Sequence, residues 1–250
     1  MLITFNSFAS LLPKELIKAQ TQVPPYQSEG LNFLIENMPP KDRRQLSAEF
    51  LLENLQYAYQ TMNYLPLSSQ IPEDIFLNYV LPYASVDERR DRWRKDFYER
   101  YINQTKDSKS IEELALKLNK QIYKDFNVSY NPDKRPKANQ SPYETIKVGY
   151  ASCTGLSILL VDVLRSVGIP ARLAGIEMWP DGSGNHTWVE IWDGQWKYLG
   201  ASESSKLNEA WFSQKAAQID LVKDEHIYAV SFKKTNQCFP MRWAKRNKSI

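Results

Sequence analysis

The residues in this sequence whose types and spacing could do chemistry are a cysteine and a histidine in its second half. Cys153 opens an apolar segment with helical character, and His186 begins a strand-like segment 33 residues later. A thiol at a helix N-terminus is stabilised as the thiolate by the unpaired backbone amides and by the helix dipole. An imidazole within reach of the sulfur could accept its proton, so the two residues could form the nucleophile and base of a cysteine enzyme.

Both residues also have a purely structural explanation. A free cysteine near the end of an apolar helix commonly packs as a small hydrophobic residue, and a single histidine on a strand is commonly a structural residue. The order and spacing of the pair do not by themselves bring the two side chains together in space. The residue types alone therefore leave a catalytic pair and a structural thiol both open.

The elements around the pair predict a fold of the α+β class. Thr154–Val167 is apolar nearly all round, which predicts a buried helix, and Gly168 and Pro170 end it. Four strand-like segments follow, and Asp193-Gly194 between the second and third is a two-residue hairpin signal. The four segments are Arg172–Met178, His186–Trp192, Gln195–Leu199 and His226–Phe232. A helix followed by an antiparallel sheet forms an α+β core.

The first half of the sequence has the periodicity of helices interrupted by proline. Apolar residues at helical spacing, and a capping box that begins at Ser110, are the evidence for these helices. They are predicted over Glu29–Met38, Asp42–Tyr64, Pro72–Val80, Val86–Ile102 and Ile111–Phe126. The mixed charges from Asp87 to Arg100 predict that the fourth helix is solvated and carries i,i+4 ion pairs.

A polar connection, Asn131–Pro142, separates the helical half from the second half. It contains three prolines and no large apolar residue, which indicates a domain boundary or an active-site loop. We predict a helical N-terminal extension over residues 1–130 and a catalytic core over residues 131–250. The alternative is a single compact unit in which the helices dock on the core.

Composition argues against several classes of function. The formal net charge is only +3, from 32 basic and 29 acidic side chains, so nucleic acid is not an expected partner. Two cysteines make no disulfide framework, and two histidines 40 residues apart predict neither a metal site nor a cofactor. No apolar run approaches the length of a membrane span. The apolar N-terminus has no basic residue before Lys14, so it is not a complete signal peptide.

The second half resembles the transglutaminase-like (papain-like) superfamily. The resemblance is carried by Gly168-Ile-Pro-Ala-Arg172 after the cysteine helix and by His186-Thr-Trp-Val-Glu190 before the hairpin, and it runs from Ser141 to Ala201. It implies a helix with the nucleophile at its N-terminus, packed on an antiparallel sheet, and a hydrolase or acyltransferase that acts on peptide or amide bonds. The helical half resembles the extension of such proteins from gut-type Bacteroidetes, which implies an extracytoplasmic location.

The resemblance also assigns roles to residues of this sequence. Cys153 becomes the nucleophile and His186 the base, whereas Gly200 occupies the position of the family's third catalytic residue, an aspartate. The acidic residue nearest to that position is Glu203, which is our candidate for the missing carboxylate. In a triad such a carboxylate orients the histidine and stabilises its protonated form.

Three further residues are candidates for contacts with the substrate. Trp188 has the same strand parity as His186 and should share its face of the sheet. Thr154 stands where many members of the family have tryptophan. Gln140, in the polar connection, could donate a hydrogen bond to an oxyanion.

Two functions of different classes are compatible with this site. The first is a thiol-dependent hydrolase or acyltransferase that forms an acyl-enzyme with a peptide or protein substrate, including one linked to cell wall or glycan. Water as the acceptor would make it a peptidase or amidase, which the resemblance favours, and an amine would make it a transglutaminase. The second is a catalytically degenerate domain that binds peptide or glycan, as Gly200 suggests. The retention of both Cys153 and His186 favours the first.

Overall fold

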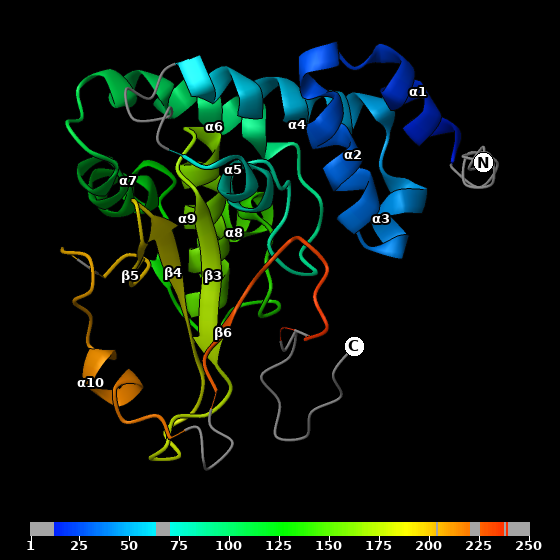
Figure 1. Ribbon diagram of the computed structural model, residues 1–250. Coiled ribbons are helices and arrows are strands. Elements are labelled where there is room, and N and C mark those ends of the chain that lie inside the picture. The colour runs from blue at the N-terminus through cyan, green and yellow to red at the C-terminus, as the bar shows by residue number, and fades with distance from the viewer. Residues whose placement is uncertain (1–12, 64–70, 204, 221–225, 238, 240–250) are drawn as a thin grey trace.

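The computed structural model describes residues 13–63, 71–203, 205–220, 226–237 and 239. Figure 1 shows the helices of the first half gathered at one end of an antiparallel sheet, with helix α9 (Cys153–Ser166) behind the strands. The protein is therefore of the α+β class with N-terminal helices, as the sequence predicted. Within the described ranges, none of the helices is long and apolar enough to cross a bilayer.

The helices of the first half begin mostly at prolines or at capping serines. Ser47 and Ser110 accept hydrogen bonds from the backbone N–H groups of Phe50 and Glu113, which satisfies one free amide at the start of α4 and of α7. The helices are α1 (Lys14–Gln22), α2 (Ser28–Asn37), α3 (Pro40–Gln45), α4 (Ala48–Gln60), α5 (Glu73–Tyr79), α6 (Trp93–Tyr101) and α7 (Ile111–Asp125).

Three of the predicted helices are confirmed, because α2, α5 and α7 begin and end within one residue of their predicted bounds. The single helix predicted over Asp42–Tyr64 is wrong, since the chain extends at Leu46 and Ser47 and forms α3 and α4 instead. The physical reason is Ser47, whose extended backbone and side-chain oxygen start a new helix rather than continue the old one.

The helix predicted over Val86–Ile102 is wrong in its first part, because α6 begins only at Trp93. The carboxylate of Glu88 turns inward and accepts hydrogen bonds from the backbone N–H groups of Ser85 and Val86 at 2.6 and 2.7 Å. Glu88 is 3% exposed, so this stretch is an internal polar network rather than a solvated helix. A side chain that takes up backbone amides in this way competes with helix formation.

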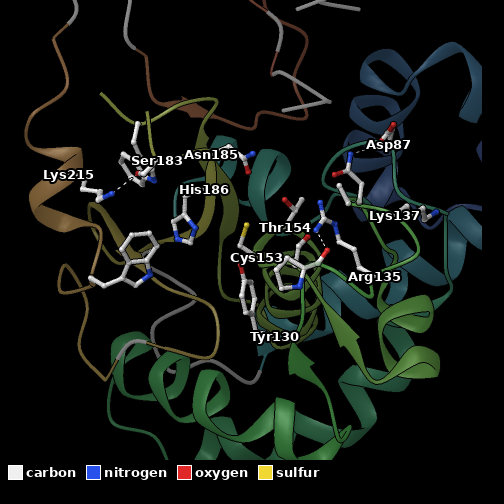
Figure 2. Close-up of a pocket in the computed structure, with 16 residues that line it drawn as sticks. Asp87, Tyr130, Arg135, Lys137, Cys153, Thr154, Ser183, Asn185, His186 and Lys215 are labelled. Atoms are coloured by element: carbon white, nitrogen blue, oxygen red, sulfur yellow. Dashed lines mark hydrogen bonds between the residues drawn. The ribbon is translucent and has the colours of Figure 1, made fainter. Parts of the chain in front are cut away.

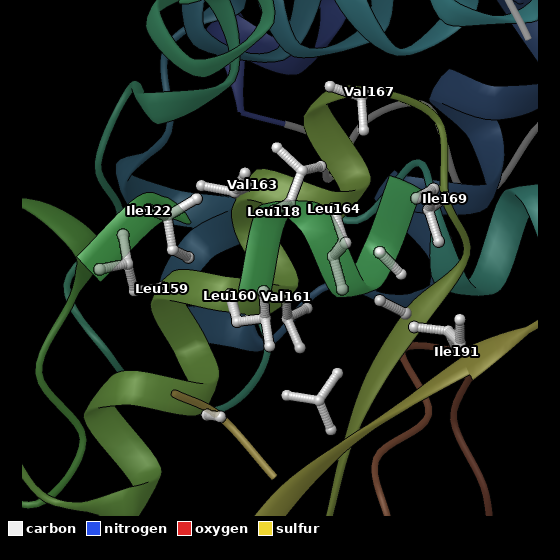
Figure 3. Close-up of a cluster of buried hydrophobic side chains, with 14 of the residues drawn as sticks. Leu118, Ile122, Leu159, Leu160, Val161, Val163, Leu164, Val167, Ile169 and Ile191 are labelled. Atoms are coloured by element: carbon white, nitrogen blue, oxygen red, sulfur yellow. The ribbon is translucent and has the colours of Figure 1, made fainter. Parts of the chain in front are cut away.

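Helix α9 is the central element of the second half, as predicted. Every residue from Thr154 to Ser166 is buried. Figure 3 shows its apolar side chains meeting those of α7, such as Leu118 and Ile122, and those of the sheet, such as Ile191. Gly168 then adopts φ 89°, a left-handed conformation that glycine takes without strain, and the chain turns into the first strand of the sheet.

The sheet has the strand order β5-β4-β3-β6 and is antiparallel throughout. Its strands are β3 (Ala171–Ile176), β4 (His186–Trp192), β5 (Trp196–Leu199) and β6 (Tyr228–Ala229). All four predicted strands are present, although β6 is shorter than its predicted segment. The predicted two-residue hairpin is wrong, because Trp192 pairs with Trp196 and leaves three residues in the turn.

Smaller elements near the start of α9 were not predicted. A short parallel pair joins β1 (Ser129–Tyr130) to β2 (Tyr150–Ala151). Between them lies α8 (Pro142–Val148), which begins at Ser141 with a capping box closed by Glu144. A short helix, α10 (Ser213–Ala216), follows β5. The domain boundary at residue 130 stays a prediction.

Two buried arginines connect the first-half helices to α9. Arg94 of α6 donates to the Arg165 carbonyl of α9 at 3.0 Å, and to three carbonyls in the segment after α5, those of residues 80, 81 and 82. Arg165 donates to the carbonyl of Tyr79 at the end of α5, to those of residues 82 and 84 in the following segment, and to that of Ala171. Burial lowers the pKa of Arg94 to about 9 and that of Arg165 to about 10, so both stay charged at neutral pH.

Substitution of Arg94 should therefore be costly. Arg94→Met leaves several buried carbonyls without a donor, and we expect the free energy of unfolding to fall by roughly 3–5 kcal/mol. Arg92→Met is the matched control, because Arg92 is two residues away and pairs with Glu53 at the surface; it should cost less than about 1 kcal/mol. Urea unfolding followed by tryptophan fluorescence measures both, and equal losses would contradict the assigned role of Arg94.

Candidate active site

Cys153 is the first residue of α9, and the short strand β2 fixes its position. Tyr130 of β1 pairs with Ala151 of β2, two residues ahead of the thiol. A Cβ on Gly155 would lie 2.7 Å from the Cβ of Ala151, so the first turn of α9 needs a glycine in order to pack against β2. The backbone that carries the thiol is thus held from the strand side and from the helix side.

His186 is the first residue of β4, and it lies near Cys153 because β4 packs on α9. The residues that follow the two, Thr154 and Thr187, share a hydrogen bond of 3.0 Å between their hydroxyl groups. The backbone of Thr187 also forms a hydrogen bond with the Cys153 thiol. Figure 2 shows the thiol and the imidazole beside one another in a single cavity. The structure thus brings together the two residues that the sequence singled out.

The cavity has a volume of about 770 Å³, which falls in the range of sites for small ligands. Tyr130 and Trp211 line it with aromatic rings that remain 58% and 56% exposed. The polar connection contributes further lining residues, among them Arg135 and Lys137. In the described part of the chain, no three His, Cys, Asp or Glu side chains are placed to hold a metal ion.

Aromatic rings enclose the imidazole of His186. Its centre lies 4.8 Å from the ring of Trp211 and 4.9 Å from that of Phe212, and Trp179 and Trp188 stack at 6.2 and 6.1 Å. This burial lowers the pKa of His186 to about 4, so the ring is neutral at pH 7 and available as a base. Its Nε2 atom is buried and has no hydrogen-bond partner among the described residues.

Burial also acts on the thiol. It raises the pKa of Cys153, and the hydrogen bonds from Thr187 and Thr154 oppose this without outweighing it. The position of Cys153 at a helix N-terminus predicts a stabilised thiolate. The structure instead favours a neutral thiol beside a neutral imidazole, because desolvation of the sulfur exceeds the effect of the nearby donors.

Glu203 lies in the turn after β5, which Asn119 of α7 holds in place. The Asn119 side chain donates to the Gly200 carbonyl at 3.0 Å and accepts from the Ser202 N–H at 2.9 Å. Burial raises the pKa of the Glu203 carboxyl, and the nearby side chain of Trp211, whose ring contacts His186, partly opposes this shift. The connection from Glu203 to His186 that the structure displays therefore runs through Trp211, and the role of Glu203 as the third triad residue stays a prediction.

The three predicted substrate-contact residues lie in different surroundings. Thr154 lines the cavity. Trp188 shares a face of the sheet with His186, as its parity predicted, but it is 2% exposed and packs behind the imidazole. Gln140 is fully buried, and its amide donates to the Tyr150 carbonyl at 3.2 Å rather than towards the cavity. Contacts of these residues with a substrate stay predictions.

Sequence reasoning missed the aromatic and basic walls of the site. Trp179 and Trp211 come from loops before and after the β4–β5 hairpin, and no periodicity in the sequence relates them to His186. Arg135 lies within the polar connection that the sequence indicates as a candidate active-site loop, and Tyr130 lies immediately before it. The prolines and polar residues of this segment predict a loop, but composition alone does not predict which side chains face the thiol.

Comparison with known proteins agrees with this fold. Residues 97–201 match the model of the transglutaminase-like superfamily, the family that the second half of the sequence resembles. The matching segment holds Cys153, His186 and Gly200. No curated protein matches the sequence.

Among solved structures, one described as a "Putative Cysteine Protease" from Cytophaga hutchinsonii is 16% identical, with a TM-score of 0.41 over 72% of this chain and 63% of that chain. The present chain thus spans less than two thirds of that protein. Calcium-bound LapG of Legionella pneumophila is 18% identical, with a TM-score of 0.35 over 55% of this chain and 74% of that chain. Likenesses at these scores add nothing to the assignment made from the family model.

The buried histidine predicts a dependence of stability on pH. Its pKa is about 6.5 in the unfolded chain and about 4 in the folded one, so the unfolded state binds a proton first as the pH falls. Its contribution to stability is complete above pH 6.5 and is lost towards pH 4. We expect His186→Phe, which keeps the aromatic packing, to lose about 2–3 kcal/mol less stability than the wild type between pH 7 and pH 4.5. Urea titrations at the two pH values test this, and parallel losses would contradict it.

Proposed function

We propose that this protein is a thiol-dependent hydrolase or acyltransferase that acts on peptide or amide bonds. The observation that carries the proposal is that Cys153 and His186 line one cavity while the residues next to them share a hydrogen bond of 3.0 Å. The transglutaminase-like family of the surrounding segment supports it. A cavity with exposed aromatic rings at its walls suits a peptide or protein substrate.

In the first half of the reaction, the Cys153 sulfur attacks the carbonyl carbon of the amide while its proton passes to His186. Because both groups start neutral, the proton moves as the carbon–sulfur bond forms, and the negative charge develops on the carbonyl oxygen. The backbone amides in the first turn of a helix have no intrahelical partner, so those at the start of α9 are the donors that we assign to this oxygen. The imidazolium then protonates the leaving amine, the carbon–nitrogen bond breaks, and a thioester on Cys153 remains.

In the second half, His186 accepts a proton from the acyl acceptor as the acceptor attacks the thioester. With water, the products are a carboxylic acid and the restored thiol; with an amine, the product is a new amide. We favour water, as the resemblance of the sequence does. The imidazole is neutral again after the first half, so it can act as the base in the second.

The second candidate is a binding domain without turnover. The unpartnered Nε2 of His186 and the absence of a side chain at Gly200 favour it, since no group fixes the orientation of the ring by a direct hydrogen bond among the described residues. In this case peptide would bind in the cavity, and Cys153 would form no thioester.

A covalent intermediate separates the two candidates. We expect a thioester at Cys153, detected by mass spectrometry after acid quenching of the protein with a pool of fluorogenic peptide amides. Cys153→Ala and His186→Ala should each lower kcat by at least about 10³-fold, and the double variant should be no worse than either single one, because the two residues act as a unit. Cys238→Ser is the control thiol; Cys238 lies outside the described residues. Binding of peptide with neither thioester nor turnover would establish the second candidate instead.

We propose further that Glu203 positions His186 through Trp211. Glu203→Gln keeps an oxygen that can accept from the indole, so kcat should stay within about 3-fold of the wild type, whereas Glu203→Ala should lower it by roughly 10-fold. The acidic limb of kcat/KM should lie near pH 4 in the wild type and the Gln variant, because base catalysis is lost as His186 becomes protonated. In Glu203→Ala, a displaced Trp211 would admit water and move that limb towards 6.5.

A direct triad role for Glu203 gives a different result. Loss of an orienting carboxylate lowers turnover by about 10²–10⁴-fold, and Gln does not rescue it. Melting temperatures of both variants control for folding.

A further inference from the structure

The walls of the cavity carry more positive than negative charge. Among the residues that the structure describes, Arg135, Lys137 and Lys215 line it, against a single acidic residue, Asp87. Figure 2 shows Arg135 and Lys137 on one side of Cys153, and His186 with Lys215 on the other. An anionic ligand would therefore meet a favourable field on entering the cavity.

The two lysines are already held by carboxylates. Lys137 pairs with Glu144 at 2.8 Å, and Lys215 pairs with Asp181 at 2.7 Å. The carboxylate of Asp87 accepts a hydrogen bond from Asn139. The two ion pairs therefore neutralise much of the positive charge that Lys137 and Lys215 bring to the cavity.

Arg135 differs from both lysines. Within the ranges that the structure describes, no carboxylate lies within ion-pair distance of its guanidinium, which donates only to the Pro132 carbonyl of its own loop. A guanidinium has five N–H donors in a planar fork that matches a carboxylate, so most of its donors are left for a ligand. It is close enough to Cys153 for its charge to favour the thiolate.

The loop that carries Arg135 is anchored at both ends. At its start, the Asn131 N–H donates to the Ala151 carbonyl at 2.8 Å, next to the N-terminus of α9. At its end, Asn139 is bound to Asp87, and Ser141 caps α8. The guanidinium is thus carried into the cavity of the thiol by a segment whose two ends are held in place.

We propose that Arg135 binds a carboxylate of the substrate, so that the cavity selects acyl donors that carry an anionic group next to the amide bond under attack. This proposal deepens the proposed function and rests on it, because an acyl donor requires acyl transfer to Cys153. The anion site itself can be tested without turnover. The carboxylate could belong to an aspartate or glutamate side chain or to the C-terminus of a peptide.

Alkylation of Cys153 by a matched pair of reagents tests the anion site without catalysis. Iodoacetate and iodoacetamide have nearly the same shape and reaction, and only the first is anionic. In a Cys238→Ser background, the ratio of the iodoacetate rate to the iodoacetamide rate at Cys153 should exceed that of free glutathione. Any change in the pKa of the thiol affects both rates, so it cancels in the ratio.

Substitutions of the basic residues that line the cavity should change this ratio of alkylation rates to different extents. Arg135→Gln should lower the ratio by roughly 5- to 10-fold, and Arg135→Lys should retain most of it. Lys137→Gln is the matched control, because Lys137 lies on the same loop and is paired with Glu144; it should change the ratio less than about 2-fold. A ratio that does not respond to Arg135→Gln, in a protein with an unchanged melting temperature, overturns the proposal.

Peptides identify the source of the carboxylate. Three fluorogenic pools are compared: peptides with an internal glutamate and an amidated C-terminus, neutral peptides with a free C-terminus, and neutral amidated peptides. Preferential turnover of the first pool would assign a side-chain carboxylate, and preferential turnover of the second would assign a C-terminal carboxylate. In Arg135→Gln, the preference in kcat/KM for the anionic pool should fall by about 10²-fold. Equal turnover of all three overturns the proposal. If no pool is turned over while the alkylation ratio responds to Arg135→Gln, the proposed function fails and the anion site stands.

Discussion

The guanidinium groups of Arg94 and Arg165 lie in the interior, 3% and 1% exposed, and they bind backbone carbonyls instead of carboxylates. Both donate to the Pro82 carbonyl, so two like charges converge on one short segment of chain between α5 and α6. Burial raises the pKa of the nearby Asp162 carboxyl well above its usual range, and neither of its oxygens has a hydrogen-bond partner among the described residues. Backbone dipoles thus carry the charge compensation, and the position of α9 against the first-half helices depends on them.

The geometry of the candidate site depends on the position of α9, which the two buried arginines hold. Helix α9 carries the thiol at its first residue, and β4, packed on the same helix, carries the imidazole at its own first residue. The hydrogen bond between Thr154 and Thr187 then joins the two elements next to the reacting groups. The aromatic residues around His186 keep water away, which lowers the pKa of the base and strengthens electrostatic interactions with any charge that develops during a reaction.

The elements whose burial follows from periodicity were predictable from sequence. The apolar residues all round Thr154–Val167 fixed the central helix, and the motif at His186 fixed β4, because both depend on local pattern. The stretch from Val86 to Arg92 was not predictable, since its structure depends on Glu88 turning inward to the backbone. The walls of the cavity depend on long-range packing: Trp211 meets His186 across 25 residues of sequence, and no local signal encodes that contact. The pKa of the thiol was misjudged for the same reason, as burial is a property of the whole fold.

The polar loop between β1 and α8 is fastened at both ends, by the β1–β2 pairing and by the cap at Ser141, while the residues between them meet the cavity. Neither fastening uses the side chain of Arg135, whereas Lys137 pairs with Glu144, the residue that closes the cap at Ser141. Residues 132–136 lie between the two fastenings, so their side chains can be exchanged while the β1–β2 pairing and the cap of α8 are kept. A library confined to residues 132–136 would vary one wall of the cavity while keeping the elements that carry the sulfur and the imidazole, which makes this short segment the place to alter ligand specificity.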